Sequence, residues 1–258
     1  MKFSDLPDDK RDVPDPPPIK AIVLAAGKGT RLQSDGLPKV MRLARGRPLL
    51  QYVLDALSFI DKQNIVIVVG YKKEAITQVY GGYSFAEQSE QLGTGHAVMS
   101  TSGIMSGYDG SVLVCCGDMP AVSRHTYESL ANEHSSCGND CTILTGGSST
   151  DLPYGRVLRN ADGGFLKIVE ERDCTSEQLK ITELNSGVYV FSAPMLFSAL
   201  KGLKRFNAQA EYYLTDVPEI MCACGAKVGI FKRDLGDEIL GVNTPEQLAQ
   251  VEKILKSR

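Results

Sequence analysis

No run of apolar residues in this 258-residue chain is long enough to span a bilayer, and its N-terminus lacks the apolar core of a signal peptide. Basic residues are not in excess either, because 28 Lys and Arg stand against 31 Asp and Glu. A broad basic surface for nucleic acid is therefore not expected. We predict that neither a membrane nor nucleic acid is a partner, and no protein partner can be read from the sequence.

The seven cysteines show neither the even number of a disulfide framework nor the paired spacing of a zinc site. An odd number in a chain of this length indicates a reducing compartment, so we predict a cytoplasmic protein. Their simplest role is that of small apolar side chains that fill the core. They are Cys115, Cys116, Cys137, Cys141, Cys174, Cys222 and Cys224.

Residues 1–18 are rich in Asp and Pro and predict a disordered leader, whereas residues 19–258 alternate between strand and helix patterns. Such alternation is typical of an α/β protein with a doubly wound, mostly parallel sheet that is covered on both faces. No repeat or linker divides residues 19–258, so we expect one domain. The predicted strands are residues 21–24, 64–69, 83–86 and 111–116, and the predicted helices are residues 48–60, 72–80, 95–105 and 123–134.

The pattern changes after Cys141. Residues 156–158 and 165–169 flank Asn-Ala-Asp-Gly-Gly, a hairpin signal, and predict an antiparallel β insertion. A strand at 184–191, helices near 194–200 and 214–224, and a strand at 227–231 are expected to follow. The last helix has the clearest start, because Thr244 suits the N-cap, Pro245 the first turn and Gln247 a capping box.

Polar clusters follow several of the predicted strands, and the first lies between Ile22 and Lys39. Small residues there let the main chain pass close to a ligand, and three cations stand on or beside the same loop. Backbone N–H groups with cations around them favour an anion, and a polyphosphate fits best. P-loop and dinucleotide-binding loops match less well, since Leu32 stands where a third glycine belongs and no Lys-Ser/Thr step follows the last glycine. An ordinary strand-to-helix turn is the alternative. The small residues are Ala25, Ala26, Gly27 and Gly29, and the cations are Lys28, Arg31 and Lys39.

Three further clusters follow later strands, where ligands of open α/β sheets gather. The amides between Gln88 and His96 offer donors and acceptors that suit a pyrimidine or purine edge. Asp118 is the hard ligand that Mg²⁺ prefers, and Asn243 can add an amide oxygen. Each also has a plain structural explanation: a glutamine-rich turn, a turn-forming Asp before Pro120, and a residue next to a helix cap.

No Ser-His-Asp or Cys-His arrangement stands out, and His96, His125 and His134 lie in helix patterns. Transfer between phosphates needs no general base when the attacking phosphate is already ionised near neutral pH, its second pKa being about 6. Metal and cationic groups then lower the repulsion between the anions. The lack of a Ser-His-Asp or Cys-His arrangement therefore fits an enzyme that catalyses transfer between phosphates.

A series of motifs stands in the order of a known family, at residues 24–31, 37–39, 88–97, 117–118, 154–156, 168–170, 185–187, 209–216 and 241–243. The chain from about Ile19 onward resembles the uridylyltransferase (pyrophosphorylase) half of the bacterial bifunctional enzyme that makes UDP-N-acetylglucosamine. Residues 24–31 mark sugar nucleotidyltransferases in general. Gln-Ser-Glu-Gln-Leu-Gly-Thr-Gly-His-Ala at 88–97 and Gln-Ala-Glu-Tyr-Tyr-Leu-Thr-Asp at 209–216 are more specific to the N-acetylglucosamine branch.

The resemblance implies a Rossmann-like nucleotide-diphospho-sugar transferase fold and Mg²⁺-dependent transfer of UMP from UTP to N-acetylglucosamine 1-phosphate. It implies that Arg31 and Lys39 bind the triphosphate and stabilise the departing pyrophosphate, and that Asp118 and Asn243 hold Mg²⁺. The implied nucleotide-binding residues are Leu24, Ala25, Ala26, Gly27, Gly29, Gln88, Gln91, Gly93 and Thr94. The implied sugar-binding residues are Gly155, Glu170 and Asn185, with Tyr213 and Thr215 nearby.

The chain departs from the family pattern at several points. Gly36 looks like an added residue before Leu-Pro-Lys, Arg42 replaces a usual His, and Cys116 replaces a Tyr that commonly precedes Gly-Asp. The sequence ends at Arg258 without the hexapeptide β-helix of the bifunctional relatives, so acetyl transfer is not expected.

Other functions stay open from the sequence. The chain could act on a different sugar 1-phosphate or nucleotide, or bind nucleotide sugars without catalysis. A nicotinamide dehydrogenase fits poorly, because the second strand ends in Gly70-Tyr71-Lys72 without an acidic ribose ligand.

Overall fold

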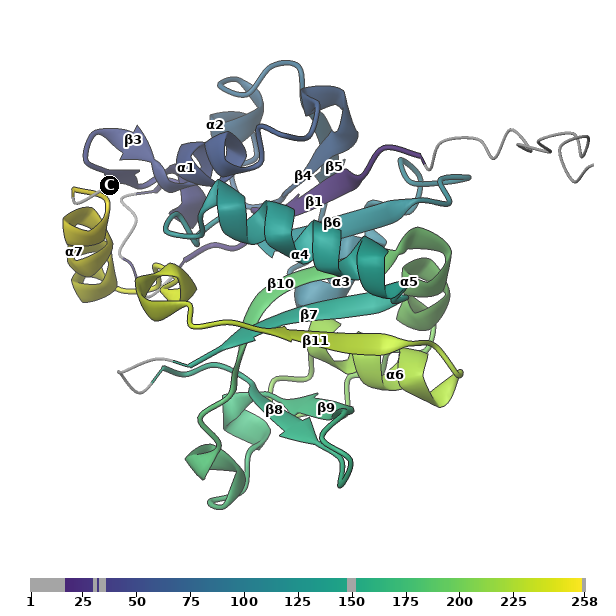
Figure 1. Cartoon of the computed structure of the whole chain (residues 1–258). Coiled ribbons are helices and arrows are strands. Elements are labelled where there is room, and N and C mark those ends of the chain that lie inside the picture. The colour runs from purple at the N-terminus through teal and green to yellow at the C-terminus, as the bar shows by residue number, and fades with distance from the viewer. Residues whose placement is uncertain (1–16, 30–31, 33–35, 148–151, 257–258) are drawn as a thin grey trace, which may run out of the picture.

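The computed structural model describes residues 17–29, 32, 36–147 and 152–256. Residues 1–16 of the predicted leader, and Arg31, lie outside these ranges. The main strands form a sheet in the order β11-β7-β10-β6-β1-β4-β5 (Figure 1). Their bounds are β1 Lys20–Leu24, β4 Ile65–Val69, β5 Ser84–Glu87, β6 Ser111–Cys116, β7 Cys141–Gly146, β10 Leu184–Ser192 and β11 Val228–Lys232.

The sheet is mostly parallel, as predicted. Strand β1 pairs in parallel with β4 and β6, β4 with β5, and β7 with β11. Strand β10 runs antiparallel to both of its neighbours, β6 and β7. All five residues of β4, Ile-Val-Ile-Val-Val, are buried, as expected for a strand that is covered on both faces.

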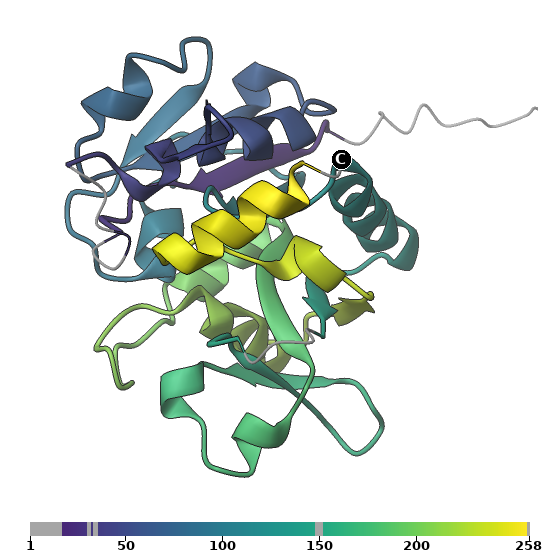
Figure 2. The same cartoon turned by 90° about the vertical axis from the view of Figure 1, so that its left-hand side faces the viewer.

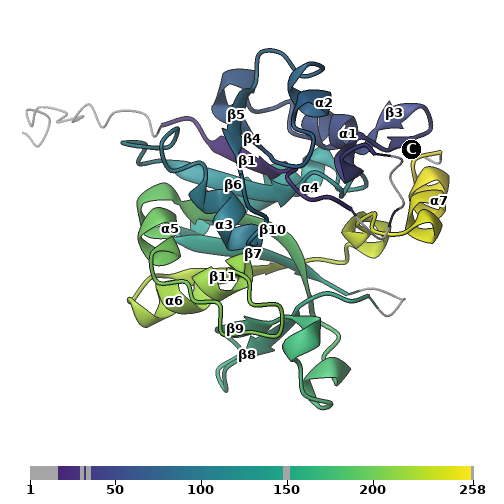
Figure 3. The same ribbon diagram turned by 180° about the vertical axis from the view of Figure 1, so that it is seen from behind.

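Helices cover both faces of this sheet. Figure 1 shows α4 (Arg124–Cys137) in front, whereas Figure 3 shows α3 (Thr94–Met99), α5 (Ala193–Leu200) and α6 (Val217–Ala223) on the opposite face. Side chains of β1 alternate between the two cores. Ala21 and Val23 pack in the core that includes residues of α1 (Leu49–Ala56), α4 and α7 (Pro245–Ile254), and Ile22 packs in the core of α3, α5 and α6. The doubly wound prediction is confirmed.

The extents predicted for three helices are wrong. Helix α2 covers Glu74–Thr77 rather than 72–80, α3 ends at Met99 rather than 105, and α1 covers Leu49–Ala56 rather than 48–60. The apolar periodicity marked burial correctly, since Leu57 and Ile60 are 0% and 4% exposed, but those residues continue in turns. After α3, the hydroxyls of Ser100 and Ser102 donate to carbonyl groups three residues earlier, which favours turns over a continued helix.

Two further differences concern strands and a helix start. Strand β7 and the short pair β2 (Leu43–Ala44) and β3 (Arg47–Pro48) were not predicted. The helix expected at 214–224 begins as the 3-10 turn η6 (Leu214–Asp216) before α6. None of the helices that the structure describes combines the length and apolar character needed to cross a membrane.

The antiparallel insertion is confirmed. Strands β8 (Arg156–Arg159) and β9 (Phe165–Val169) form a hairpin that joins the sheet through β10. With the turns η4 (Glu171–Asp173) and η5 (Gln178–Lys180), the hairpin projects from one end of the sheet, in green at the bottom of Figure 2. The two predicted helix caps are also present: Ser123 Oγ accepts from Thr126 N at 3.2 Å, and Thr244 and Gln247 form a capping box.

Candidate active site

Two adjoining cavities open beyond the carboxyl ends of the parallel strands. The first, which we call the loop cavity, measures about 310 Å³ and is lined by residues that include Ala25, Gly27 and Gln88. The second, which we call the insertion cavity, measures about 180 Å³ and is lined by residues that include Glu170 and Asn185. The cavities share part of their wall, so ligands in the two would meet there. The shared residues are Leu24, Thr94, Cys116 and Asp118.

The loop after β1 forms one wall of the loop cavity. The N–H of Ala25 donates to Val68 O at 2.9 Å. This amide is therefore not available to an anion, contrary to the prediction for the loop. Within the described residues, no backbone hydrogen bond uses the N–H groups of Ala26 and Gly27. Gly29 has φ +66°, and a Cβ there would lie 2.5 Å from Lys39 Cβ. Glycine is therefore required where the loop packs against Lys39.

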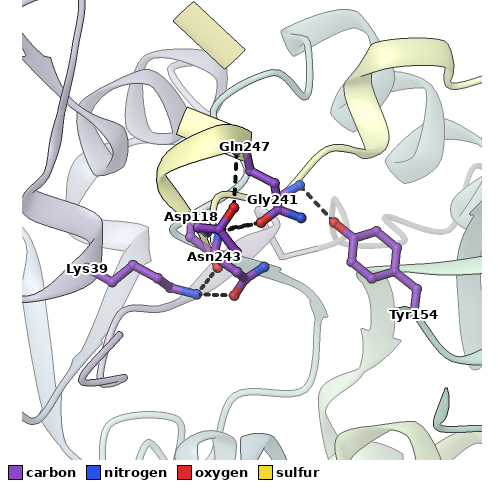
Figure 4. A network of polar contacts seen from close by, with 7 residues as sticks. Lys39, Asp118, Tyr154, Gly241, Asn243 and Gln247 are labelled. Carbon is purple, nitrogen blue, oxygen red and sulfur yellow. Dashed lines mark hydrogen bonds and ion pairs between the residues drawn. The ribbon is translucent and has the colours of Figure 1, made fainter. Parts of the chain in front are cut away.

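A lysine, an aspartate and an asparagine converge where the two cavities meet. The ammonium of Lys39 forms an ion pair with Asp118 and donates to Asn243 Oδ1 at 2.9 Å (Figure 4). The side chains of Lys39 and Asp118 are 17% and 15% exposed, so the pair is largely removed from water. Lys39 reaches this point although Gly36 precedes it in the loop.

Backbone contacts between remote segments hold Asp118 and Asn243 in place. Gly117 N donates to Leu24 O at 2.9 Å, which fixes the end of β6 next to the loop. Val242 N donates to Asp118 O at 2.9 Å, and Asn243 N donates to Gln247 Oε1 at 2.7 Å. Gln247, which completes the capping box of α7, thus also holds the backbone of Asn243, and Figure 4 shows this contact.

Asp118 and Asn243 are the residues that could hold a divalent ion at this point. Their oxygens already meet on a cation, the ammonium of Lys39. Among the described residues, His, Cys, Asp and Glu form no cluster of three or more that could hold a metal. Two oxygen donors suit Mg²⁺ better than Zn²⁺. Mg²⁺ keeps several waters and takes further oxygens from substrate phosphates. The donor set therefore fits magnesium.

The glutamine-rich segment forms another wall of the loop cavity. Gln88 is 4% exposed, its Nε2 donates to Gly93 O at 2.9 Å, and Gln91 Nε2 donates to Gln88 O at 3.3 Å. Gly93 has φ +105°, and a Cβ there would lie 2.6 Å from Tyr212 O. Leu214 N donates to Thr94 Oγ1 at 3.1 Å. The segment that precedes α6 thus packs directly on the glutamine-rich loop.

Polar side chains of the insertion cavity come from separate elements. Thr215 Oγ1 donates to Glu170 Oε1 at 2.9 Å. Burial raises the pKa of Glu170, and the hydrogen bond from Thr215 offsets part of that rise. Asn185 lies at an irregularity of β10, and its Nδ2 donates to Tyr189 Oη at 2.7 Å. Such bulges re-aim side chains next to binding sites.

The structure gathers most of the predicted site residues. Gly29 packs against Lys39 instead of lining a cavity, and Tyr213 is buried outside the described cavity linings. Arg31 lies outside the described residues. The loop cavity holds Leu24, Ala25, Ala26, Gly27, Lys39, Gln88, Gln91, Gly93, Thr94 and Asp118, and the insertion cavity holds Gly155, Glu170, Asn185, Thr215 and Asn243.

Tyr154 and Cys116 are among the residues of the site that were not assigned a role from the sequence. Tyr154 lies in a quoted motif, but its hydroxyl accepts from Gly241 N at 2.7 Å, a partner 87 residues away that no local pattern could indicate. Cys116 stands between the two cavities. Burial raises the pKa of its thiol, so it is held protonated and is unsuited to act as a nucleophile.

Comparisons with known proteins identify the family. The model of the MobA-like NTP transferase domain matches residues 21–210. The bifunctional protein GlmU of Pelotomaculum thermopropionicum is 44% identical over 241 residues, which are 93% of this chain and 52% of that protein. The same protein of Streptococcus suis is 44% identical over 239 residues, which are 92% of this chain and 52% of that protein. The chain thus spans about half the length of the curated relatives it matches.

A solved structure shares the fold. The crystal structure of a UDP-glucose pyrophosphorylase complexed with UDP-glucose has a TM-score of 0.73 at 16% identity and covers 93% of this chain and 100% of that chain. The Rossmann-like fold implied by the resemblance is therefore confirmed. The resemblance itself is confirmed by the 44% identity to the GlmU proteins. The chain belongs to the MobA-like NTP transferase family and is a nucleotidyltransferase.

Proposed function

We propose that this protein transfers UMP from UTP to N-acetylglucosamine 1-phosphate, giving UDP-N-acetylglucosamine and pyrophosphate, with Mg²⁺ as cofactor. One observation carries the proposal: two cavities meet at a point where Lys39, Asp118 and Asn243 converge. The 44% identity to GlmU proteins supports this choice of substrates. The UDP-glucose complex of a protein with the same fold supports a uridine nucleotide joined to a sugar as the bound product.

The chemistry requires positioning and charge rather than a protein nucleophile. An ionised oxygen of the sugar 1-phosphate attacks the α-phosphorus of UTP in line. The new P–O bond forms as the bond between the α-phosphorus and the bridging oxygen breaks, and that oxygen leaves with pyrophosphate. No proton has to be removed from the attacking phosphate, so the step requires no general base.

Charged groups at the shared wall would lower the repulsion between the two substrates. Asp118 and Asn243 would hold Mg²⁺, which neutralises charge on phosphate oxygens when it is bound. Lys39 would bind the triphosphate and stabilise the charge that develops on pyrophosphate. Arg31 is proposed to act with Lys39 on the strength of the motif alone.

The insertion cavity would bind the amino sugar. Glu170 and Asn185 offer acceptors for hydroxyl and amide hydrogens, and Thr215 steadies the Glu170 carboxylate at 2.9 Å. The main chain at Gly155 lines the same cavity. The loop cavity would bind the uridine and triphosphate, because its lining combines the small residues Ala25 to Gly27 with the amides of Gln88 and Gln91 and the ammonium of Lys39.

We also propose that residues 19–258 form one nucleotidyltransferase domain in the cytoplasm. All seven cysteines are free, which supports a reducing compartment.

A panel of nucleoside triphosphates and sugar 1-phosphates, scored by pyrophosphate release with and without Mg²⁺, tests the proposal. We expect the highest kcat/KM with UTP and N-acetylglucosamine 1-phosphate and no turnover in EDTA. Faster turnover with glucose 1-phosphate would contradict the choice of sugar. Cys116 is relevant to that choice, because its small side chain lies between the two cavities. Tight binding of UDP-N-acetylglucosamine without any Mg²⁺-dependent turnover would instead indicate a binding module.

A further inference from the structure

The side chain of Gln88 is held from two sides. Its Nε2 donates to Gly93 O at 2.9 Å and lies 3.2 Å from His96 Nδ1. Its backbone N–H donates to Val69 O at 2.8 Å, which anchors the residue to the end of β4. Neighbouring residues therefore fix the orientation of this buried amide.

The two side-chain contacts decide which end of the amide meets the loop cavity. Gly93 O can only accept a hydrogen bond, so the group that faces it is the NH₂ of Gln88 and not its carbonyl oxygen. The second N–H then points at His96 Nδ1, which has to be the unprotonated ring nitrogen. Because both hydrogens are used, Oε1 is what Gln88 can offer to a ligand in the cavity that it lines.

His96 is itself in contact with a neighbouring aromatic ring. Its ring stacks on Tyr212, with ring centroids 6.2 Å apart and an interplanar angle of 28°. Tyr212 N donates to Leu92 O at 2.8 Å, Tyr212 O accepts from Gly95 N at 2.8 Å, and the Arg205 guanidinium lies 5.6 Å from the Tyr212 ring centroid. The imidazole thus presents a fixed acceptor to Gln88.

We infer that His96 is a positioning residue that orients the Gln88 amide so that the loop cavity selects bases with an N3–H, uracil or thymine, against cytosine. The N3–H of an imide base donates to Gln88 Oε1, whereas N3 of cytosine is an acceptor and would face the lone pairs of that oxygen. The inference rests on the proposed function, because it concerns the base of the nucleotide that the same site binds.

Equilibrium binding of UDP and CDP to wild type and to His96 variants tests the inference by calorimetry. Wild type is expected to prefer UDP by more than about 100-fold, the scale on which buried polar groups reject a mismatched partner. His96→Phe keeps a ring to stack on Tyr212 but removes the acceptor, so the amide is free to turn. We expect the UDP/CDP ratio to fall by about 10-fold or more, with weaker UDP binding and tighter CDP binding.

Two further variants separate positioning from stability. Asn at position 96 restores an acceptor, so His96→Asn should recover most of the wild-type ratio. His125 is an exposed histidine of α4, and His125→Phe is the matched control that should leave both affinities unchanged. In turnover assays, the loss in His96→Phe should appear in KM for UTP and not in kcat. An equal loss of UDP and CDP affinity, or an unchanged ratio in His96→Phe, would overturn the inference.

A measurement on wild type needs no variant to fold. Ring ¹⁵N shifts of the three histidines distinguish a protonated from an unprotonated Nδ1. We expect His96 to carry its proton on Nε2 at neutral pH, and a protonated Nδ1 would overturn the inference. Failure of the proposed function would give a different result from failure of this inference. Selective binding of UDP would persist, but no pyrophosphate would be released from UTP with any sugar 1-phosphate.

Discussion

The two cavities that meet at Asp118 are built in different ways. The loop cavity takes part of its lining from the continuous stretch Leu24 to Gly27, which contains three small residues, and part from Gln88 and Gln91. The insertion cavity is lined by larger polar side chains from separate elements, among them Glu170 after β9, Asn185 on β10 and Thr215 on η6. The loop cavity thus includes a continuous stretch of small residues, whereas the insertion cavity gathers polar side chains from separate elements.

This difference indicates which properties single substitutions can change. A wall of small residues depends on the path of the chain and is altered when glycine or packing residues change. A side-chain lining can change its ligand when one residue is replaced, without any change in fold. We therefore expect substitutions around the insertion cavity to alter the choice of sugar, and substitutions at the shared wall to stop the chemistry for every substrate.

The largest effect is expected at the shared wall. Asp118→Ala removes the carboxylate proposed to hold the metal and should lower kcat by about 1000-fold, the upper range for a group that stabilises transition-state charge. Pyrophosphate release at saturating UTP measures this, with Asp162→Ala in the exposed β8–β9 turn as the matched control. A rate close to that of wild type at limiting Mg²⁺ would show that Asp118 does not hold the metal.

A somewhat smaller loss is expected for Lys39→Met. Removal of the ammonium should raise the activation free energy by about 2–4 kcal/mol, because positive charge at the triphosphate is lost. Without nucleotide, the same variant should bind Mn²⁺ more tightly than wild type, since the ammonium no longer competes for Asp118 and Asn243.

Mn²⁺ titration followed by electron paramagnetic resonance tests the second expectation. Lys253→Met on the exposed face of α7 is the control. Unchanged kcat together with unchanged Mn²⁺ affinity in Lys39→Met would show that Lys39 acts neither on the triphosphate nor at the metal site.

In the insertion cavity, Glu170→Gln should raise KM for the sugar 1-phosphate by about 10-fold and leave KM for UTP nearly unchanged. Burial raises the pKa of Glu170, so the carboxylate gains its proton at a higher pH than an exposed glutamate does. As pH falls through that raised value, KM for the sugar 1-phosphate should increase in wild type and stay flat in Glu170→Gln. Equal changes in both KM values would indicate that the two cavities do not divide the substrates as proposed.

The smallest effect concerns stability next to the insertion cavity. Burial, with Glu219 and Asp173 nearby, raises the pKa of Asp216 to about 6 from an ordinary 3.8. A carboxyl that holds its proton more tightly when folded favours the folded state at low pH, and this contribution is lost as pH rises from about 4 to 6. Asp216→Asn should therefore increase the free energy of unfolding by about 1 kcal/mol at pH 7, after allowance for solvent screening.

Thermal melting of Asp216→Asn and wild type at pH 7 and pH 4 measures this difference. The gain in Tm at pH 7 should shrink at pH 4, where Asp216 is protonated in the folded protein. A gain of the same size at both values would mean that the carboxylate charge is not its cause.

The sequence was most informative where a feature depends on neighbouring residues. The loop after β1, the clusters at Gln88 and Asp118, and the capping box at Thr244 each follow from local residue types, and the structure brings them to one place. The parallel sheet was predictable for the same reason, since apolar strands and amphipathic helices alternate along the chain.

Features that depend on remote partners could not be predicted. The pairing of β7 with β10, and the contact of Tyr154 with Gly241, join segments whose local patterns do not refer to one another. His96 fitted a helix pattern and does lie in α3, but its role as a partner of Gln88 requires the fold that closes the loop at Gly93. Helix ends were misplaced because the same apolar spacing continues through turns.

The central claim is that substrates occupying the two cavities meet at Asp118 and Asn243 around a divalent ion. Crystals grown with UDP-N-acetylglucosamine and Mn²⁺, measured near the manganese absorption edge, test it most directly. The account predicts an anomalous peak bound by Asp118 and Asn243 and touching the diphosphate, with uracil in the loop cavity beside Gln88 and the sugar in the insertion cavity beside Glu170. An anomalous peak away from both side chains, or a nucleotide bound outside the loop cavity, would contradict it.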